Sequence, residues 1–564
     1  MKKLVKLREK IEHKNMREAV EDMARRFSSQ VAFRYRKNPH DKETVAVTYQ
    51  QLRDDVLALG TELLSMGLHG KHCAVIGKNS YNWVRTYFAL LSIGAVMVPL
   101  DRDWGAEELA DTVKKADTAI IIADCDIDEK IKKVSELSGT DRLVSLDGEG
   151  DDSIAGLVEA GKIKAQGGDS SYFDVEIDPT VMSLLVFTSG TTGKGKGVML
   201  SQRNILSDLA DIIPYIDFSR KCMNVLPPHH TYGSSVTIYG QASIGCEIYI
   251  SSGIRYVPKE LKEFAPGHIV VVPLYVETFY RKVLAGIRDS GKEGLVRKMM
   301  KLSNALRKIG IDLRKKFFGK ILASFGGELN MIITGGAPIN QEIIDTFDAI
   351  GVTVLNGYGI TECAPLISVN HNNYIVNGSV GPVIDIDEVK IDEPNEDGEG
   401  EILVKGPNVM LGYYKDEETT AAAFDEDGFF RTGDYGKLGE NRVITITGRK
   451  KNLIILSNGK NVYPEEIENE LSSVPGVLEI IVYEGQSKRG LEHNKIVAEI
   501  YPDKDYLEKN GITDAYAHLK PYIDKYNRTA VPYKKIDILK VREEEFPKNT
   551  LRKILRFNMD MTID

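Results

Sequence analysis

The sequence predicts an α/β protein in which a large, multi-subdomain N-terminal region of layered sheets precedes a small α+β C-terminal domain. Three observations support this fold class: strands alternate with helices over long stretches, one segment rich in Gly and Pro interrupts that pattern, and the chain has 564 residues. Strands that alternate with helices form largely parallel sheets with helices on their faces. A chain of this length exceeds one compact core, so we expect about three or four domain-sized units.

The alternation is clearest between residues 45 and 125. The runs VAVTY, HCAVIG, VMVPL and AIIIADC are typical of strands, and helical patterns lie between them. Further on, MSLLVFT, VVVPL, MIITGG and VTVLNGYG are short apolar runs that end in glycine-rich or polar turns. Ligands of such sheets bind at the carboxyl ends of the strands. We therefore expect the chemistry of the protein at these turns.

Near residue 385 the pattern changes to closely spaced Gly and Pro with short alternating strands, which is typical of an antiparallel unit. A junction follows around 445–461, and after it come a helix, two strands, a helical stretch and a last strand. We predict a main domain over 1–449, with a small antiparallel β unit at about 380–449, and a small α+β domain over 450–564.

Composition and charge exclude several classes of protein. The net charge of −9 gives no sign of the basic field of a nucleic-acid binder. The N-terminus lacks the apolar run of a secretory signal, and no stretch approaches the ~20 apolar residues that span a bilayer. The sequence predicts a cytoplasmic protein. Five cysteines form no CxxC or Cys/His cluster along the chain, which favours a reducing compartment over a disulfide framework: Cys73, Cys125, Cys222, Cys246 and Cys363.

The strongest functional signal is the run LLVFTSGTTGKGKGVMLSQRN, residues 184–204. An apolar strand leads directly into residues 188–197, which are only Thr, Ser, Gly and Lys. Glycines let backbone N–H groups close around an anion, hydroxyls donate hydrogen bonds and lysines supply charge. The run is not a Walker loop, because Gly193 and Lys194 are followed by glycine. A flexible surface loop is the alternative interpretation, and the strand directly before the run argues against it.

This run resembles the signature of the adenylate-forming (AMP-binding) superfamily, and the chain as a whole is most similar to the long-chain fatty acyl-CoA synthetases. In the usual form, TSGTTGxPKG, a proline stands where this chain has Gly195. The resemblance implies that residues 1–449 are the AMP-binding adenylation domain. It also implies that the loop binds the phosphates of ATP through Thr188, Ser189, Gly190, Thr191, Thr192, Gly193 and Lys196.

Further motifs follow in the order of the family. LPPHHTYG (226–233) matches the segment whose histidine, here His230, lines the acid site. MIITGGAPI (331–339) resembles the turn that packs on adenine. Taken alone, the first motif is a structural His-His pair and the second is a turn. They support the resemblance because they occur in the order of the family. The residues implied at the adenine are Gly336, Ala337 and Pro338.

NGYGITECAP (356–365) resembles the segment that holds phosphate and metal. By resemblance Tyr358 stacks near adenine, Thr361 binds phosphate, and Glu362 coordinates the Mg²⁺ that bridges the phosphates of ATP. Magnesium prefers one or two protein carboxylates together with phosphate oxygens, so the residue type fits. The nucleotide contacts implied by this segment are Asn356, Gly357, Tyr358, Gly359 and Thr361.

The resemblance also implies ribose contacts and a hinge. FFRTGDYG supplies Asp434 and ITGRKKNLI supplies Arg449, which hold the ribose hydroxyls in the family. An isolated Asp or Arg in a turn is far more often a solvated charge. Lys451 is the implied hinge, about which the mobile C-terminal domain rotates between two half-reactions. That rotation would bring SNGKN (457–461), with Gly459, toward the pantetheine tunnel.

FPKNTLRKILR (546–556) resembles the motif of the C-terminal catalytic lysine. Lys553 takes the place of the lysine that reaches the carboxylate and the α-phosphate, although Arg552 stands where the common form has glycine. A surface lysine is the alternative interpretation. The implied catalytic residues are therefore Lys553, Thr361 and His230.

Together these motifs imply an ATP-dependent acid:thiol ligase that uses ATP, Mg²⁺ and coenzyme A. Amino-acid-activating relatives place an aspartate near the histidine motif, and HHTYGSSV has none, so a plain acid such as a medium- or long-chain fatty acid is favoured. Two alternatives stay open. The acyl group could be loaded on a carrier-protein thiol, or the chain could be a non-catalytic nucleotide- or acyl-binding relative.

The stretch 291–320 is strongly basic. It contains ten Lys or Arg against only Glu293 and Asp312, interleaved with apolar residues. Such a surface can touch anionic lipid, where long acyl substrates partition. The alternative, which is more common, is a solvated helix whose apolar stripe packs on the core.

Overall fold

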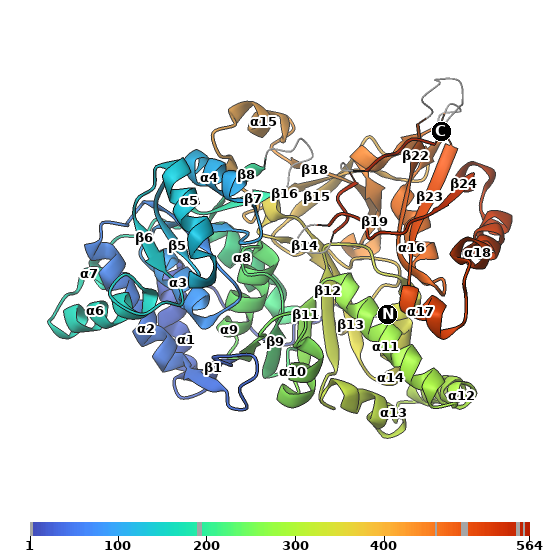
Figure 1. Ribbon diagram of the computed structural model, residues 1–564, viewed down its shortest axis with the longest axis horizontal. Coiled ribbons are helices and arrows are strands. Elements are labelled where there is room, and N and C mark those ends of the chain that lie inside the picture. Colours follow the sequence, from blue (N-terminus) through green and yellow to red (C-terminus); the bar gives the residue numbers. More distant parts are fainter. Residues whose placement is uncertain are drawn as a thin grey trace.

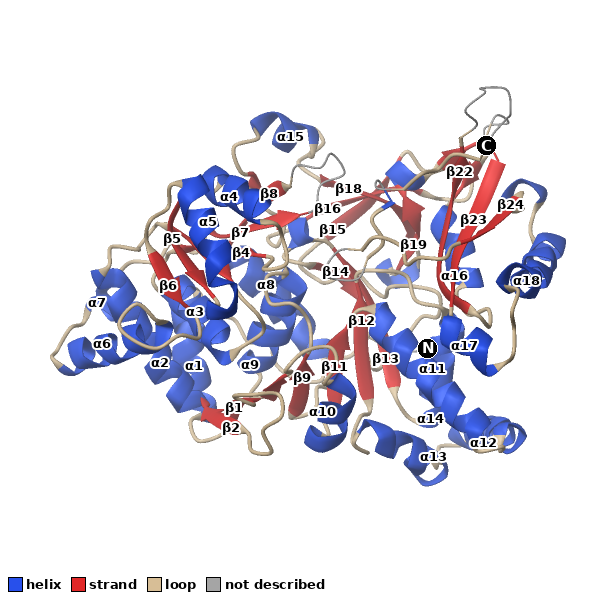
Figure 2. Cartoon of the chain, viewed as in Figure 1, coloured by secondary structure: helices blue, strands red, loops and turns tan. Residues whose placement is uncertain are grey.

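The computed structural model is a mixed α/β structure whose sheets are joined by helices (Figures 1 and 2). In the part of the chain that it describes, a seven-stranded and an eight-stranded sheet lie side by side, followed by a four-stranded antiparallel sheet and a C-terminal three-stranded sheet. The described residues are 4–188, 195–456, 460–486, 495–548, 553–556 and 559–563.

The seven-stranded sheet has the order β17-β8-β7-β4-β3-β5-β6. Its strands all run in the same direction except β8, which pairs antiparallel with both β7 and the edge strand β17. Successive side chains point to opposite faces: Cys73 and Val75 pack toward α3, whereas Ala74 and Ile76 pack toward α4 and α5. The strands are β3 (His72–Ile76), β4 (Val96–Leu100), β5 (Thr118–Ala123), β6 (Leu143–Ser145), β7 (Met182–Thr188), β8 (Lys196–Ser201) and β17 (Gly412–Tyr413). The helices of this part are α1 (Met16–Phe27), α2 (Tyr49–Ser65), α3 (Tyr81–Ser92), α4 (Ala106–Lys115), α5 (Asp128–Ser138), α6 (Ile154–Gln166) and α7 (Ser171–Asp174).

The eight-stranded sheet has the order β14-β13-β12-β11-β9-β10-β1-β2, and only its two outermost strands are antiparallel. Helix α8 and the π-helix η3 share one hydrophobic core with both large sheets, so they lie between them. The other face is covered by α10, α11, α13 and α14. The strands are β1 (Val31–Tyr35), β2 (Val45–Thr48), β9 (Lys221–Asn224), β10 (Glu247–Ile250), β11 (His268–Val271), β12 (Met331–Gly335), β13 (Thr353–Gly359) and β14 (Leu366–Val369). The helices are α8 (Gln202–Ile212), η3 (Tyr232–Gly240), α9 (Gln241–Ser243), α10 (Val257–Phe264), α11 (Pro273–Asp289), α12 (Glu293–Arg307), α13 (Arg314–Leu322) and α14 (Gln341–Ile350).

Local sequence explains where several helices begin. Helices α2 and α8 each start with a capping box, in which the side chains of Thr48 and Ser201 accept from backbone N–H groups and the third helical residue reciprocates. Helix α11 starts at Pro273, whose missing N–H is no loss at the first helical position. The run VVVPL, expected as a strand, is therefore a strand only up to Val271, and that expectation was wrong for its end.

The antiparallel unit expected near residue 385 is present as a four-stranded sheet, with β15 (Glu388–Asp392), β16 (Gly400–Lys405), β18 (Phe430–Leu438) and β19 (Ile444–Arg449). Helix α15 (Glu417–Ala422) follows β17.

The chain beyond Arg449 has a core of its own, made of residues from Ile454 to Ile536. In it β22 and β23 pair antiparallel and β24 joins in parallel. Its elements are β20 (Ile454–Ile455), β21 (Asn461–Val462), α16 (Pro464–Leu471), β22 (Val477–Gly485), β23 (Lys495–Pro502), α17 (Lys504–Lys509), α18 (Ala515–Thr529) and β24 (Ile538–Val541). The predicted fold class is confirmed, whereas the boundary between residues 449 and 450 stays a prediction.

The C-terminal elements contact the rest of the chain beside α11 and α14 (Figure 1). The side-chain amide of Asn340 donates to the carbonyl of Asn469 on α16 at 2.7 Å. The guanidinium of Arg288 lies 5.5 Å from the ring centre of Tyr506 on α17. Among the described residues, no helix is both long enough and apolar enough to cross a membrane.

Candidate active site

The carboxyl ends of β12 and β13 form the floor of the candidate site. These strands pair in parallel, with Gly335 opposite Gly357 and Thr334 opposite Asn356. After β12 the chain turns at Gly336, whose φ of +87° favours glycine. The three residues predicted at the adenine are exposed in this turn: Gly336, Ala337 and Pro338.

Two polar atoms at this floor are buried and have no hydrogen-bond partner among the residues that the structure describes: Oδ1 of Asn356 and Oγ1 of Thr334. A buried acceptor without a donor costs free energy unless a ligand satisfies it. The amide oxygen of Asn356 can accept from an exocyclic amine such as that of adenine, so this observation fits the predicted nucleotide.

Asp434, Arg449 and Tyr358 form one hydrogen-bonded group. Asp434 and Arg449 face each other in the register of β18 and β19. One carboxylate oxygen of Asp434 lies 2.9 Å from Nε of Arg449, and the other accepts from the hydroxyl of Tyr358 at 2.8 Å. The carboxylate raises the pKa of Arg449. The structure therefore brings Tyr358 together with Asp434, which lies 76 positions further along the chain, and with Arg449.

Lys553 reaches the same place from the C-terminal part of the chain. A Cβ atom at Gly336 would lie 3.9 Å from its Nζ. Burial, together with the nearby charges of Arg449 and Lys451, lowers the pKa of Lys553 to about 8, while Asp434 opposes this shift. The lysine that the sequence places in the catalytic role thus lies between the adenine turn and the Asp434–Arg449 pair.

His230 lies close to this lysine. Burial lowers its pKa well below the usual range, and the neighbouring His229 and Lys553 lower it further. The two histidine rings lie 4.3 Å apart, and Nε2 of His229 is 3.6 Å from a carboxylate oxygen of Asp101. His230 is therefore a neutral imidazole at neutral pH. It lies two residues before the π-helix η3, a kind of element frequent at functional sites.

Glu362, the predicted metal ligand, lies in a short 3₁₀ turn, Thr361–Cys363, after β13. Its Oε1 accepts from the hydroxyl of Tyr413 at 3.0 Å, and Nζ of Lys196 lies 4.9 Å from the centre of the same ring. Lys196 pairs with Thr188 across the β7–β8 hairpin. Lys196 of the predicted phosphate loop and the predicted metal ligand thus contact the same tyrosine, which sequence reasoning missed.

The other predicted residues divide in two groups. Lys451 lies in a short turn directly after Arg449, and desolvation of its ammonium together with the like charge of Arg449 lowers its pKa. Gly357 and Gly359 lie at the end of β13, and Thr361 follows. Six predicted ligands lie outside the described residues: Ser189, Gly190, Thr191, Thr192, Gly193 and Gly459.

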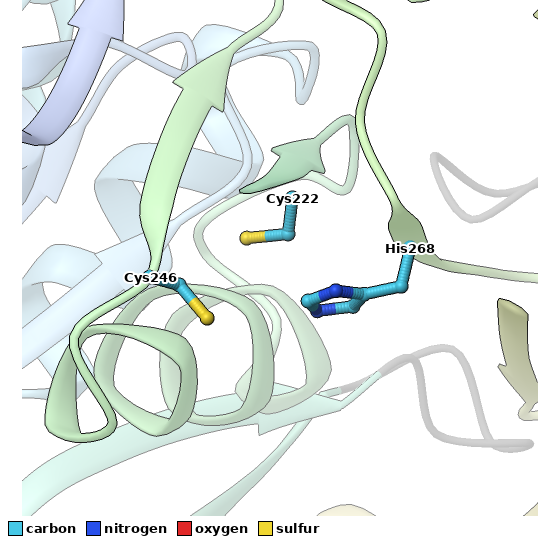
Figure 3. A group of neighbouring side chains, drawn as sticks. All are labelled: Cys222, Cys246 and His268. Atoms are coloured by element: carbon cyan, nitrogen blue, oxygen red, sulfur yellow. The ribbon is translucent and has the colours of Figure 1, made fainter. Parts of the chain in front are cut away.

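A second cluster lies away from this site. Within the described ranges, Cys222, Cys246 and His268 bring two thiols and an imidazole within 4.8 Å of one another (Figure 3). The sequence showed no Cys/His cluster because the three residues come from different strands. The thiol of Cys246 donates to the carbonyl of Ser219, and Nε2 of His268 hydrogen-bonds Gln241 at 2.8 Å. The cluster is at the amino ends of β9, β10 and β11, opposite to the strand ends of the candidate site.

Comparison with known proteins decides the family. The profile described as "AMP-binding enzyme" matches residues 20–414 of the chain. The chain belongs to this family. The predicted superfamily is therefore confirmed, and so is the class of AMP-forming ligases.

Individual members of the family cover most of the chain. Long-chain-fatty-acid–CoA ligase 6 of Rattus norvegicus is 30% identical over 519 residues, which cover 84% of this chain and 73% of the relative. Long-chain-fatty-acid–[acyl-carrier-protein] ligase AEE15 of Arabidopsis thaliana is 29% identical and covers 84% of this chain and 74% of its own. Among solved structures, ATP-bound MatB from Rhodopseudomonas palustris superposes with a TM-score of 0.72 at 23% identity, covering 96% of this chain and 97% of its own. That similarity shows the fold.

Proposed function

We propose that this member of the AMP-binding enzyme family is a fatty acid–CoA ligase that uses ATP, Mg²⁺ and coenzyme A. The acid's carboxylate attacks the α-phosphate of ATP, which gives an acyl-adenylate and pyrophosphate; the thiol of coenzyme A then displaces AMP. A carboxylate needs this activation because oxide is too poor a leaving group. The observation that carries the proposal is the position of Lys553, between the Gly336 turn and the Asp434–Arg449 pair.

Each residue of the site has a role in this reaction. Asp434, held by Arg449 and Tyr358, presents a carboxylate that accepts hydrogen bonds from ribose hydroxyls. Asn356 accepts from the adenine amine. Lys553 offsets the charge that builds on the α-phosphate, a preorganised electrostatic effect. Catalysis is then positioning and charge neutralisation, with no side-chain nucleophile.

Glu362 and Lys196 would hold the triphosphate end of the nucleotide. The Glu362 carboxylate is a hard oxygen ligand of the kind that suits Mg²⁺. Bound there, the metal would neutralise charge on the phosphate oxygens. Lys196 lies over the ring that also contacts Glu362, so metal ligand and phosphate lysine face one region.

The acid and the thiol are proposed from the relatives. The rat relative is named as a ligase of long-chain fatty acids and coenzyme A, and the plant relative as a ligase of the same acids and an acyl-carrier protein. Neutral His230 is consistent with an acid that brings an apolar chain.

ATP–pyrophosphate exchange with a panel of acids tests the first half-reaction. We expect exchange with fatty acids of twelve or more carbons, on the order of the chain lengths that partition into lipid, and little with acetate or amino acids. Supplying coenzyme A or acyl-carrier protein in the second step separates the two acceptors. Exchange with none of the acids would contradict the proposal and favour a non-catalytic binder.

We further propose that the basic segment 291–320 touches anionic lipid. In the structure this segment is two helices, α12 and α13, separated at Gly310, whose φ is +81°. Val296, Met299 and Met300 pack against the core, as the alternative interpretation expects. Four large apolar side chains nevertheless remain exposed beside the lysines: Leu295 at 54%, Leu302 at 52%, Ile309 at 70% and Ile311 at 44%.

Co-sedimentation with vesicles that contain anionic lipid tests this contact. Lys298→Glu with Lys301→Glu is expected to lower the bound fraction several-fold, since each basic residue near the surface contributes about 1 kcal/mol. Lys71→Glu with Lys114→Glu, the same charge change on exposed residues elsewhere, is the control. Equal binding of the wild type and both double variants would contradict the proposal.

A further inference from the structure

Tyr413 lies between two residues of the proposed site that belong to distant parts of the chain. Its hydroxyl donates to Oε1 of Glu362 at 3.0 Å, and Nζ of Lys196 lies 4.9 Å from its ring centre. The ring is 7% exposed, so the contact with Glu362 is shielded from bulk water. One side chain therefore meets both the proposed metal ligand and the lysine of the phosphate loop.

The backbone holds this tyrosine firmly on the strand that carries Lys196. Strand β17 pairs antiparallel with β8, with Tyr413 opposite Val198. The N–H of Tyr413 donates to Oγ1 of Thr420 on α15 at 2.8 Å. Three residues before the tyrosine, the N–H of Met410 donates to the backbone carbonyl of Glu362, also at 2.8 Å. The segment 410–413 therefore holds both the backbone and the carboxylate of Glu362.

The phenol of Tyr413 is restricted to the donor role. An ionised carboxylate only accepts hydrogen bonds. The hydroxyl of Tyr413 therefore donates to one oxygen of Glu362, Oε1. The hydrogen bond fixes the rotation of the carboxylate and leaves the other oxygen, Oε2, for a further ligand.

We propose that Tyr413 is a positioning residue that orients Glu362 so that its second carboxylate oxygen faces the magnesium of the nucleotide. The proposal rests on the proposed function, since it takes Glu362 as the metal ligand. Groups that hydrogen-bond a metal ligand set its orientation, and their removal typically costs about 10- to 100-fold in metal affinity. Tyr413 acts through Glu362 and does not itself touch the metal.

The substitution Tyr413→Phe separates this role from packing, because it keeps the ring against Lys196 and removes only the hydroxyl. The chain also supplies a matched control in the next residue. The hydroxyl of Tyr414 donates to Asp117 at 2.7 Å, away from the site. Tyr414→Phe therefore removes an equivalent phenol hydrogen bond to a carboxylate at a neighbouring position.

Equilibrium binding of Mn²⁺, followed by the loss of its free electron paramagnetic resonance signal, gives a readout that does not depend on turnover. The measurement uses the full chain with saturating α,β-methylene-ATP. We expect Tyr413→Phe to weaken Mn²⁺ binding by about tenfold and Tyr414→Phe to leave it unchanged. In exchange assays Tyr413→Phe should need more Mg²⁺ for its half-maximal rate, while its KM for the acid should be unchanged.

Measuring Mn²⁺ binding by the Glu362→Gln variant distinguishes failure of this proposal from failure of the proposed function. If Glu362→Gln weakens Mn²⁺ binding and Tyr413→Phe does not, the positioning role of Tyr413 is refuted and the metal ligand stands. If Glu362→Gln binds Mn²⁺ like the wild type, the metal assignment itself is refuted, and this proposal with it. In the Glu362→Gln background, Tyr413→Phe should cause no further loss, because the group that it positions is already gone.

Discussion

At the scale of single residues, the site is a balance of charges around Lys553. Burial, together with two nearby cations, lowers the pKa of its ammonium to about 8, and one nearby carboxylate opposes this shift. A lysine with an ordinary pKa would carry its charge at any working pH. Here the charge is present at neutral pH and is lost in mildly alkaline solution.

The first prediction is a pH dependence. The folded-state pKa of Lys553 lies below the ordinary value of 10.5, so the charged form is lost as pH rises through about 8. For adenylation, kcat/KM reports the ionisation of the free enzyme, and we expect it to fall on the alkaline side of about pH 8. Lys553→Arg should shift this fall to higher pH, since a guanidinium stays charged. An unshifted profile in the arginine variant would show that another group titrates.

Substitution Lys553→Ala is the second prediction. Removing a group that stabilises charge in the transition state costs on the order of 10²- to 10³-fold, and we expect a loss of that size in ATP–pyrophosphate exchange. Transfer of the acyl group from supplied acyl-AMP to coenzyme A should survive. Lys520→Ala, on the surface of α18 beside Asp524, is the control. Equal loss in both half-reactions would refute this division of labour.

At the scale of elements, the ends of β12 and β13, which the sequence pointed to, lie side by side in the structure. The turns after β12 and β13 could be predicted because apolar runs that end in glycine are visible in one short stretch. The Tyr413 contact could not be predicted. It depends on pairing of β17 with β8, which are about two hundred residues apart, and a Gly-Tyr-Tyr turn gives no signal of its partner.

Two other features also could not be predicted from local sequence patterns: the cluster of two cysteines and a histidine, and the division of the basic segment into two helices. Cys222, Cys246 and His268 meet only because β11, β9 and β10 are neighbours in an order that differs from their order along the chain. The basic segment 291–320 is two helices because the chain passes Gly310 with positive φ. Hydrophobic periodicity predicts single helices and strands, whereas the order of strands in a sheet depends on residues that are far apart in the chain.

The third prediction concerns the contacts between the C-terminal elements and the main body. Asn340→Ala with Arg288→Ala removes the hydrogen bond to Asn469 and the contact with Tyr506. Each contact stabilises this arrangement by about 0.5–1.5 kcal/mol. We expect the rate of adenylation to fall by about fivefold or more, with no loss in acyl transfer from supplied acyl-AMP. Equal rates of adenylation in the variant and the wild type would show that these contacts do not hold the arrangement.

At the scale of the whole molecule, the chain has separate hydrophobic cores on either side of Arg449. Few elements join them, and the residues between β19 and β20 carry consecutive lysines, Lys450 and Lys451. The division into 1–449 and 450–564 stays a prediction, and it has a direct test.

The fourth prediction is that trypsin cuts first at Lys450 or Lys451 and releases the C-terminal part as a stable fragment. Ligands that bind only the arrangement in which Lys553 lies beside Gly336 stabilise that arrangement by mass action. α,β-Methylene-ATP with a fatty acid should therefore slow the cut by tenfold or more, about the ratio of the ligand concentration to its Kd. Fragment masses identify the site. Faster cleavage elsewhere, with this junction intact, would contradict the predicted boundary.

The position of Lys553 against Gly336, described above as geometry, has a consequence for the direction of the reaction. A group that lowers the barrier between acid and adenylate lowers it equally for pyrophosphate returning to the adenylate. Because this ammonium is supplied by a part of the chain with its own core, withdrawing that part removes the group from both directions at once. The acyl-adenylate would then remain in a site that no longer promotes its reaction with pyrophosphate. Its reaction with the thiol would then be the favoured step.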